Sequence, residues 1–547
     1  MSTRSTKSGS SKKAQTKHRG FDAYSRRDHE IMAESPDVIS ERVWQIAVIV
    51  IFVIAAVLRL YDLNLVPLHH DEGVNGNFLV RLVREGHYQY DPENYHGPTL
   101  YYFAAIIPWI VKLLFGNSAR ETYGLTTFTI RLIPALFGLG TIGLVFLLRR
   151  RLGTVATLAA ALMMGVSPGA VYLSRYFIHE TLFVFFTLGI VVALVRFYDE
   201  RNPSYLLPAA ASASLLFATK ETAMISVGVL IIALLLTVAY MQFNAGRRYR
   251  SGGVSDLIDE LGGTASLMGT IGVACIVFLA LYILFYSSFF TNYKGINDSL
   301  QTFAVWTKTG RAAHVHPPSQ YLEWLIRIEA PLLFLGAIGA IFAVLKPKNS
   351  FALFCALWSF GLIAAYSLIP YKTPWLMLNF LIPLALISGY AIQAIFEMDH
   401  ARWRLASLVL LIAVGIATYQ SLDLNFRNYD NDNQQYVYVY AHTTRGALDL
   451  VNHVEEIAKE NAGGLTGITI VSPDYWPLPW YFRNFSRVGY FGRMAATSEP
   501  IIIANANQKE EVDANYGQFY EQVLSNEPGG TFQLRPGVNL LLYERRR

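Results

Sequence analysis

The stretch VWQIAVIVIFVIAAVLRLY, residues 43–61, contains one charged side chain, Arg59, in nineteen residues. A run of about 20 apolar residues is long enough for a helix to cross the hydrocarbon core of a bilayer. The whole chain of 547 residues is 53% hydrophobic and only 16% charged, whereas a soluble domain carries roughly 25% charged residues. The sequence therefore predicts an α-helical polytopic membrane protein. Its net charge of +5 gives no indication of a nucleic-acid partner.

Apolar blocks of similar length recur through the first 420 residues. The two cysteines, Cys275 and Cys355, both lie inside such blocks and are predicted to be small core residues, without a disulfide framework or a cysteine metal site. We predict eleven membrane spans, at 43–60, 128–148, 154–173, 181–198, 204–219, 222–242, 264–290, 321–345, 350–370, 375–396 and 403–420.

One further apolar segment, TLYYFAAIIPWIVKLLF at 99–115, is short and carries Lys112. Positively charged loops favour the cytoplasmic side of a membrane. If 99–115 does not cross, the basic N-terminal tail shares one side with all later basic clusters; if it crosses, the tail lies opposite them. We therefore predict that 99–115 is an amphipathic helix on the outer surface of the plasma membrane, with the N-terminus inside and the C-terminus outside. The clusters are RRR (149–151), RRYR (247–250), KPK (346–348) and RWR (402–404).

The pattern changes after residue 420. RGALDLVNHVEEIAKEN (445–461) has helical periodicity, whereas GITIVS (467–472), PIIIANA (500–506) and VNLLLYE (538–544) are typical of strands. EEVDANYGQFYEQVLSNE (510–527) is predicted as a second helix. The sequence thus predicts three regions: a disordered cytoplasmic tail at 1–42, a transmembrane domain at 43–420 and a small extracytoplasmic α/β domain at 421–547.

Four polar residues follow the first span, in the stretch VPLHHDEGVNG. They are His69, His70, Asp71 and Glu72. A carboxylate in this position can serve as a general base or as a metal ligand. Acidic residues are also favoured in the first turn of a helix, and DEGVNGNFLVRLVREG (71–86) is typical of a surface helix. The residues alone leave both interpretations open.

A second polar group is predicted on the same side, where the segment SRYFIHE ends a span. Arg175, His179 and Glu180 are costly at a membrane boundary unless they are paired or functional. His179 and Glu180 could join His69 and His70 in a metal site, because imidazole and carboxylate together are a suitable ligand set. Simple hydrogen-bonded roles within the fold are at least as well supported.

Two lysines predicted on this side have two interpretations each. Lys220 sits beside Glu221 in a tight hairpin, where it could contact the substrate or only form a salt bridge with Glu221. Lys372 lies between Pro370 and Pro374, where it could bind a phosphate as a point charge or only extend to the interface from a helix end. No nucleotide-binding motif or nucleophile elbow is visible. A substrate that arrives through the bilayer therefore fits the chain better than a soluble nucleotide.

These motifs, in this order, resemble the GT-C superfamily of membrane glycosyltransferases, which use polyprenyl-phosphate sugars. HHDEGVNGNFLV, YHGPTLYYFAAIIPWIVKLLFG, RLIPALFGLGTIGLVFLLRRRLG and SPGAVYLSRYFIHE are similar to segments of the protein O-mannosyltransferases and the aminoarabinose transferases. Together with KTPW and YWPLPWYFRN, they most resemble the flippase-associated membrane proteins of archaeal N-glycosylation clusters and their bacterial members. The resemblance covers the chain from residue 43 onward. It implies a GT-C fold with two outer juxtamembrane helices.

The resemblance implies an inverting glycosyltransferase that moves a sugar from a polyprenyl-phosphate donor to an unidentified glycan, lipid or protein acceptor. It implies that Asp71 is the base, that Glu72 orients it and that His96 lies near the donor. We predict Lys372 and Arg175 as ligands of the donor phosphate. A non-catalytic role in moving or assembling glycolipids is the alternative. No cofactor is established and a divalent metal stays open; the further candidates for substrate contact are His179, Glu180 and Lys220.

The segment DYWPLPWYFRN (474–484) of the C-terminal region concentrates aromatic side chains, among them Trp480. Aromatic rings with polar neighbours are common on sugar-binding surfaces and equally common in domain cores. Pro477 and Pro479 predict a stiff loop. Because this region is predicted to lie on the same face as Asp71, we predict that the loop caps the membrane cavity and contacts the acceptor through Trp480, with core packing as the alternative.

Overall fold

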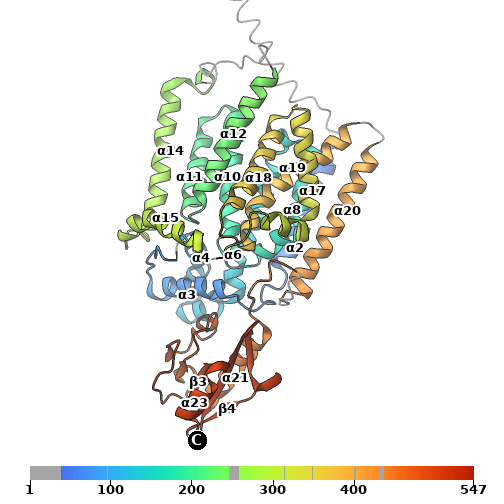
Figure 1. The fold of residues 1–547 in the computed structure, drawn as a ribbon. Helices are drawn as coiled ribbons and strands as arrows, with labels where there is room; N and C mark the ends of the chain where they lie inside the picture. The colour runs from blue at the N-terminus through green and yellow to red at the C-terminus, as the bar shows by residue number, and fades with distance from the viewer. Residues whose placement is uncertain are drawn as a thin grey trace, which may run out of the picture.

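The computed structural model describes residues 39–94, 96–245, 258–312, 314–347, 349–398, 402–429 and 436–546. The predicted tail at 1–42 lies almost entirely outside these ranges, and so does the basic cluster at 247–250. The described chain forms a bundle of helices with a small domain of strands and helices at one end (Figure 1).

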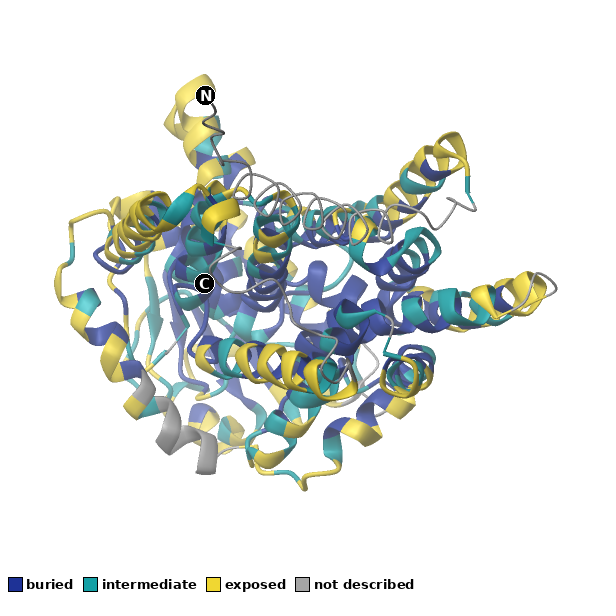
Figure 2. Cartoon of the chain, turned by 90° about the horizontal axis from the view of Figure 1, so that it is seen from above, coloured by how far each residue is buried: buried dark blue, intermediate teal, exposed yellow. Residues whose placement is uncertain are grey.

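Eight helices within the described ranges are long and apolar enough to cross a membrane. Exposed residues lie on the outward faces of the peripheral helices and buried residues fill the centre (Figure 2). This arrangement confirms a multi-pass membrane protein. The helices are α2 (Glu41–Leu60), α6 (Thr127–Phe146), α10 (Glu180–Glu200), α12 (Ala223–Ala245), α14 (Gly263–Tyr286), α18 (Ser350–Leu368), α19 (Leu378–Glu397) with the turn before it, and α20 (Trp403–Leu422).

Two of the predicted spans are bent helix pairs. α8 (Thr154–Val166) and α9 (Pro168–Ser174) meet at 60°, and α16 (Gln320–Ile328) and α17 (Ala330–Leu345) meet at 111°. A proline stands at the start of the second helix of each pair. Proline lacks an amide hydrogen and disfavours a helical residue before it, so the first helix ends there. Counting each pair as one span gives up to ten spans in the described ranges.

The predicted span at 204–219 is a shorter apolar helix, α11 (Leu206–Phe217), of 12 residues. A helix of that length measures about 18 Å, whereas the hydrocarbon core is about 30 Å thick. In the described ranges, the eight to ten helices of spanning length and the shorter α11 together correspond to the predicted spans, about eleven in number.

Two helices lie at the end of the bundle that carries the C-terminal domain: α3 (His70–Glu85) and α4 (Thr99–Phe115) (Figure 1). The first half of α4 is largely buried, whereas its last residues, including Phe115, are exposed. Neither helix is among those of spanning length, which agrees with the two predicted juxtamembrane helices. A third helix at this level, α15 (Lys294–Ala312), follows α14 and is not predicted from the sequence.

Basic segments gather at the opposite end of the bundle, where α2 begins. Arg149 donates to the Glu41 carboxylate (2.8 Å), and the Asn349 amide donates to the carbonyl oxygen of Arg151 (2.8 Å). These contacts bring the 149–151 cluster beside the first turn of α2 and beside the segment that follows α17. The cluster at 149–151 and the described part of the cluster at 346–348 thus lie at the end of the bundle where α2 begins.

The C-terminal domain is built on a mixed sheet with the strand order β2-β1-β3-β6-β4, and β5 also pairs with β6. β1 runs parallel to β2 and β3, whereas β6 is antiparallel to β3, β4 and β5. α21 (Arg445–Glu460) buries Leu450 and Val454 against one face of this sheet. The strands are β1 (Ile468–Ile470), β2 (Val488–Tyr490), β3 (Ile501–Asn505), β4 (Tyr520–Val523), β5 (Phe532–Arg535) and β6 (Val538–Arg545).

Most elements predicted for this domain are confirmed as α21, β1, β3 and β6. The predicted helix at 510–527 is wrong in its second half, because α23 (Lys509–Tyr516) ends and β4 follows. β4 pairs with β6, for example Gln522 with Tyr543, and this long-range pairing overrides the local helical pattern. β2 and β5 have three and four residues, too few for alternation to show in the sequence.

Candidate active site

A pocket of about 470 Å³ lies between the membrane helices and the C-terminal domain. Its walls come from the start of α3, the turns before α4 and α12, the segment before α10, the segment before α19, and the C-terminal region. Four carboxylates and two lysine or arginine side chains line it. They are Asp71, Glu93, Glu180, Glu221, Lys220 and Arg535.

The start of α3 is fixed by His69. Its Nδ1 accepts the amide hydrogen of Asp71 (3.1 Å), while the Glu72 carboxylate accepts the amide hydrogen of His69 (3.1 Å), which together form a capping box. The Nε2 of His69 donates to the carbonyl oxygen of Tyr440 (3.0 Å). Both ring nitrogens are in use, so His69 is a helix cap and the predicted surface helix is present.

Glu72 is buried and bound to Arg131 of α6. Its Oε1 accepts from Nε of Arg131 (2.7 Å) and from the amide of Phe177 (2.8 Å), and its Oε2 accepts from Nη2 of Arg131 (2.6 Å). Arg131 also donates to the carbonyl oxygen of Leu63 (2.8 Å). Glu72 does not line the pocket. Its carboxylate anchors the first turn of α3, which carries Asp71, to α6, and its role in orienting Asp71 stays a prediction.

Asp71 lines the pocket with a side chain that is 40% exposed. Nδ1 of His69 lies 3.9 Å from its Oδ2, and no side chain of the described ranges donates a hydrogen bond to this carboxylate. Acidic residues are favoured in the first turn of a helix, where Asp71 lies. Burial lowers the pKa of the neighbouring His70 below its usual value. A carboxylate without a hydrogen-bond donor can accept a proton from a bound molecule.

Lys220 and Glu180 form a buried ion pair on a second wall, with Nζ and Oε1 2.5 Å apart. Burial alone would lower the pKa of Lys220, but the carboxylates of Glu180 and Glu221 raise it above its usual value. Glu221 in turn contacts Nδ1 of His96 (3.2 Å). The predicted pairing of Lys220 with Glu221 is therefore corrected, because the start of α10 brings in Glu180 as the closer partner.

His179 is buried beside this ion pair. Its Nε2 donates to the carbonyl oxygen of Gly97 (3.0 Å), which links the segment before α10 to the turn before α4. Burial, together with the neighbouring His96 and Lys220, holds the pKa of His179 well below its usual value. The ring is therefore neutral near pH 7.

The predicted metal candidates do not form one ligand set. Within the described ranges, no group of three or more His, Cys, Asp or Glu side chains could hold a metal ion. His69 is engaged at both nitrogens, and His70 is its neighbour at the start of α3. His179 and Glu180 lie on the wall formed by the segment before α10, where the Glu180 carboxylate is already paired with Lys220. These residues do not fit a divalent metal, and no step below uses one.

Arg175 and Lys372, the predicted phosphate ligands, do not line the pocket. Arg175 donates to the carbonyl oxygens of Tyr61 (2.5 Å) and Asp62 (2.8 Å), just past the end of α2. Nζ of Lys372 donates to the carbonyl oxygen of Ile369 (2.5 Å), just past the end of α18. Each cation binds main-chain carbonyls beside a helix end, and a role for either in binding the donor phosphate stays a prediction.

Trp480 is also outside the pocket. It is 1% exposed and packs on α3, where a Cβ atom on Gly76 would lie 2.6 Å from its ring. The next residue, Tyr481, accepts the amide hydrogen of Leu68 with its hydroxyl (2.8 Å). Part of the predicted loop is a short helix, α22 (Leu478–Tyr481). The alternative of core packing therefore describes Trp480, and its predicted contact with an acceptor is corrected.

Several lining residues are not predicted from the sequence. Arg535 of β5 and the connector residues Tyr440 and Ala441 come from the C-terminal region, and Asn75 comes from the second turn of α3. Of the motif KTPW, Trp375 lines the pocket and Lys372 does not. No local pattern marks Arg535, because it reaches the pocket only through the docking of the two domains.

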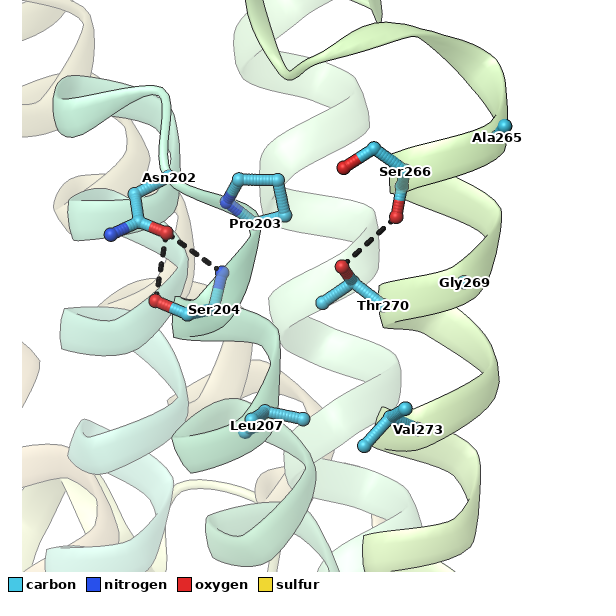
Figure 3. Close-up of a pocket in the computed structure, with 9 residues that line it drawn as sticks. All are labelled: Asn202, Pro203, Ser204, Leu207, Ala265, Ser266, Gly269, Thr270 and Val273. Carbon is cyan, nitrogen blue, oxygen red and sulfur yellow. Dashed lines mark hydrogen bonds between the residues drawn. The ribbon is translucent and has the colours of Figure 1, made fainter.

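A second cavity, of about 450 Å³, lies between the start of α11 and α14, at the end of α10 remote from Glu180 (Figure 3). Its polar lining consists of Asn202, Ser204, Ser266 and Thr270, and none of its lining residues is charged. It therefore offers no group for acid–base chemistry, and the 470 Å³ pocket is the candidate site.

The fold of the chain matches solved structures. The ArnT protein of Cupriavidus metallidurans, bound to undecaprenyl phosphate, aligns with a TM-score of 0.61 and 12% identity over 90% of this chain and 97% of that chain. The chain has the GT-C fold. The oligosaccharyltransferase AglB of Archaeoglobus fulgidus, in complex with an inhibitory peptide and a dolichol-phosphate, shares the GT-C fold with a TM-score of 0.51 and 13% identity over 90% of this chain and 74% of that chain.

Part of the sequence also matches a family model. Residues 103–251 match the family model of the dolichyl-phosphate-mannose-protein mannosyltransferases. No curated protein matches the chain significantly. Another structure of the Archaeoglobus oligosaccharyltransferase, with a TM-score of 0.50, contains zinc and sulfate. The predicted resemblance to the GT-C superfamily of membrane glycosyltransferases is confirmed.

Proposed function

We propose that this chain transfers a sugar from a polyprenyl-phosphate donor to an acceptor bound in the pocket, with Asp71 as the base. One observation carries the proposal: the Asp71 carboxylate is open to the pocket and no described side chain donates to it. Two proteins with the same fold hold undecaprenyl phosphate or a dolichol-phosphate, which supports a lipid-phosphate donor. A pocket between membrane helices and a domain outside the bundle is open to both a lipid and a water-borne or lipid-borne acceptor.

The proposed transfer forms one bond and breaks one. An acceptor hydroxyl attacks the anomeric carbon of the sugar while Asp71 takes the hydroxyl proton. The bond between the anomeric carbon and the phosphate oxygen breaks, and its electron pair leaves with the polyprenyl phosphate. A single displacement of this kind inverts the anomeric configuration. A positioned base contributes about 10²–10⁴-fold to such a rate.

Lys220 is the cation that we assign to the donor phosphate, in place of Arg175 and Lys372. Of the described residues that line the pocket, only Lys220 and Arg535 are a lysine or an arginine. Lys220 belongs to the membrane domain, at the turn before α12, where the phosphate of a bilayer lipid would arrive. The ion pair with Glu180 keeps its ammonium group charged. A fixed cation stabilises the negative charge that builds up on the departing phosphate.

We place the pocket on the extracytoplasmic face of the plasma membrane. Basic segments gather at the other end of the bundle, and basic loops favour the cytoplasmic side. The N-terminus is then cytoplasmic, and the C-terminal domain is extracytoplasmic.

The test replaces Asp71 in the full chain, purified in lipid nanodiscs and supplied with polyprenyl-phosphate sugars and an envelope fraction as the source of acceptor. Asp71→Asn should lower sugar transfer about 10²–10⁴-fold without weakening the binding of undecaprenyl phosphate. Asp449→Asn, at an exposed position of α21, is the matched control and should be fully active. Transfer by Asp71→Asn at the rate of the unchanged protein would contradict the proposal.

The alternative is a non-catalytic partner that moves or organises glycolipids. It predicts a different result in the same cells. Loss of the chain would then change the distribution of a glycolipid across the membrane, and Asp71→Asn would restore it as well as the unchanged chain does. Under the proposed function, cells with Asp71→Asn accumulate the donor and lack the product in mass spectra of their glycolipids and surface glycans.

A further inference from the structure

The pocket has two permanent cations, and they come from different domains. Lys220 stands at the turn between α11 and α12, paired with Glu180. Arg535 stands on β5 of the C-terminal domain and reaches the pocket from that side. Because a polyprenyl-phosphate sugar carries a single phosphate and arrives from the bilayer, Lys220 accounts for it. Arg535 is left without a ligand in the proposed reaction.

Arg535 lies on the Asp71 side of the pocket. Its charge and that of Asp474 act on His70, the residue before Asp71. Its Nη2 donates to the carboxylate of Asp474, and the two side chains are 20% and 38% exposed. The guanidinium group has five N–H donors in a planar fork, so one contact with Asp474 leaves it capacity for a second anion.

We propose that Arg535 binds an anionic group of the acceptor, a phosphate or a carboxylate, and so selects an acceptor that carries such a group near the hydroxyl that reacts at Asp71. This inference rests on the proposed function. The acceptor base Asp71 and the fork of Arg535 are both open to the pocket, so one molecule can contact both.

Asp474 competes with an external anion for the guanidinium group of Arg535. The inference therefore predicts opposite effects on anion binding when Arg535 or Asp474 is replaced, which a purely structural ion pair does not. Removal of Arg535 deletes the anion site. Removal of the Asp474 charge frees the fork, so an external anion should bind more tightly. If the pair only stabilised the domain, both changes would act in the same direction.

The experiment uses the full chain in nanodiscs that are saturated with undecaprenyl phosphate, so that Lys220 is occupied. Binding of glycerol 3-phosphate, glycerate and glycerol is measured by calorimetric titration. Both anions should bind and glycerol should not. Arg535→Gln should weaken the anions about tenfold or more, because a charge-assisted hydrogen bond is lost. Arg535→Lys should lie in between, and Asp474→Asn should strengthen binding.

Arg487→Gln is the matched control, because Arg487 pairs with Glu499 in the same domain (2.5 Å) and does not line the pocket; its titrations should equal those of the unchanged chain. Equal anion binding by Arg535→Gln, equal binding of glycerol and the anions, or weaker binding by Asp474→Asn would each overturn the inference. Failure of the unchanged chain to bind undecaprenyl phosphate would instead overturn the proposed function, and the inference with it.

Discussion

Arg131 of α6 and Glu72 of α3 form a bidentate ion pair that is almost fully enclosed, with side chains 2% and 0% exposed. Nη2 and Oε2 are 2.6 Å apart, and Nε and Oε1 are 2.7 Å apart. Glu72 also accepts from the amide of His69, so the pair reaches the cap of α3. The position of Asp71 in the pocket is therefore fixed by a contact between the first juxtamembrane helix and a membrane helix.

Loss of one partner of this pair should be costly. Glu72→Gln leaves the Arg131 charge buried without its counter-charge, and such a change destabilises by about 3–5 kcal/mol. Thermal unfolding in detergent should show this loss, and transfer activity should fall because Asp71 is no longer held. The control is Glu121→Gln, which breaks the partly exposed pair with Arg84 (2.7 Å) and should cost less than about 1 kcal/mol. Equal losses for the two variants would show that the buried pair does not anchor α3.

Gly76→Ala tests the contact between the C-terminal domain and α3. The added Cβ would lie 2.6 Å from the Trp480 ring, and overpacking of this kind costs about 1–3 kcal/mol. The unfolding temperature should fall, and limited proteolysis should release the C-terminal domain sooner. Gly228→Ala on α12, where a Cβ meets nothing within 4 Å, should not destabilise the chain. A stable Gly76→Ala protein would mean that Trp480 does not clamp α3.

The stability of the chain should fall in mild acid. His442 of the connector is buried, with its Nδ1 3.3 Å from the Tyr172 hydroxyl. Burial, with the nearby charge of Arg131, holds its pKa well below its usual value. Below about pH 6.5 the histidine is protonated in the unfolded chain but stays neutral in the folded chain. Each such histidine therefore lowers the free energy of unfolding by up to about 1.4 kcal/mol per pH unit.

Unfolding temperatures measured from pH 7.5 to pH 5 should therefore decrease below pH 6.5. His442→Asn should make the unfolding temperature less dependent on pH, because the variant no longer takes up a proton at this position on unfolding. The exposed residue His87, whose side chain is 53% exposed, provides the control: His87→Asn should keep the slope of the unchanged chain. An unaltered slope in His442→Asn would exclude His442 as a source of the acid sensitivity.

The orientation in the membrane can be tested with single cysteines. Cys275 is exposed on α14, so it is first replaced by serine. Tyr123→Cys, at a position that is 68% exposed beyond α4, should then react with an impermeant thiol reagent added outside intact cells. Arg402→Cys, at the exposed start of α20, should react only after the membrane is opened. The reverse pattern would overturn the extracytoplasmic placement of the pocket.

The sequence supports a large part of this description. The apolar blocks predict the membrane helices, because a span needs length and composition and little else. The start of α3 can also be predicted from the sequence, because acidic residues that follow a polar cap indicate a helix N-terminus. The motif order gives the GT-C resemblance, which the fold confirms. The two bent pairs carry a local signal as well, in the prolines that begin α9 and α17.

The assignment of individual polar residues depends on partners that lie far away in the chain. Glu72 is next to Asp71 in the sequence, but its carboxylate is bound to Arg131. Lys220 is next to Glu221 in the sequence, but its closer partner is Glu180. Composition and periodicity determined that this chain crosses a membrane and where its polar residues cluster. Only the tertiary structure decided that, of the neighbours Asp71 and Glu72, Asp71 is left open to the pocket and that Arg535 faces it. A buried charge is stabilised by whichever opposite charge or carbonyl the packed fold brings within hydrogen-bond distance.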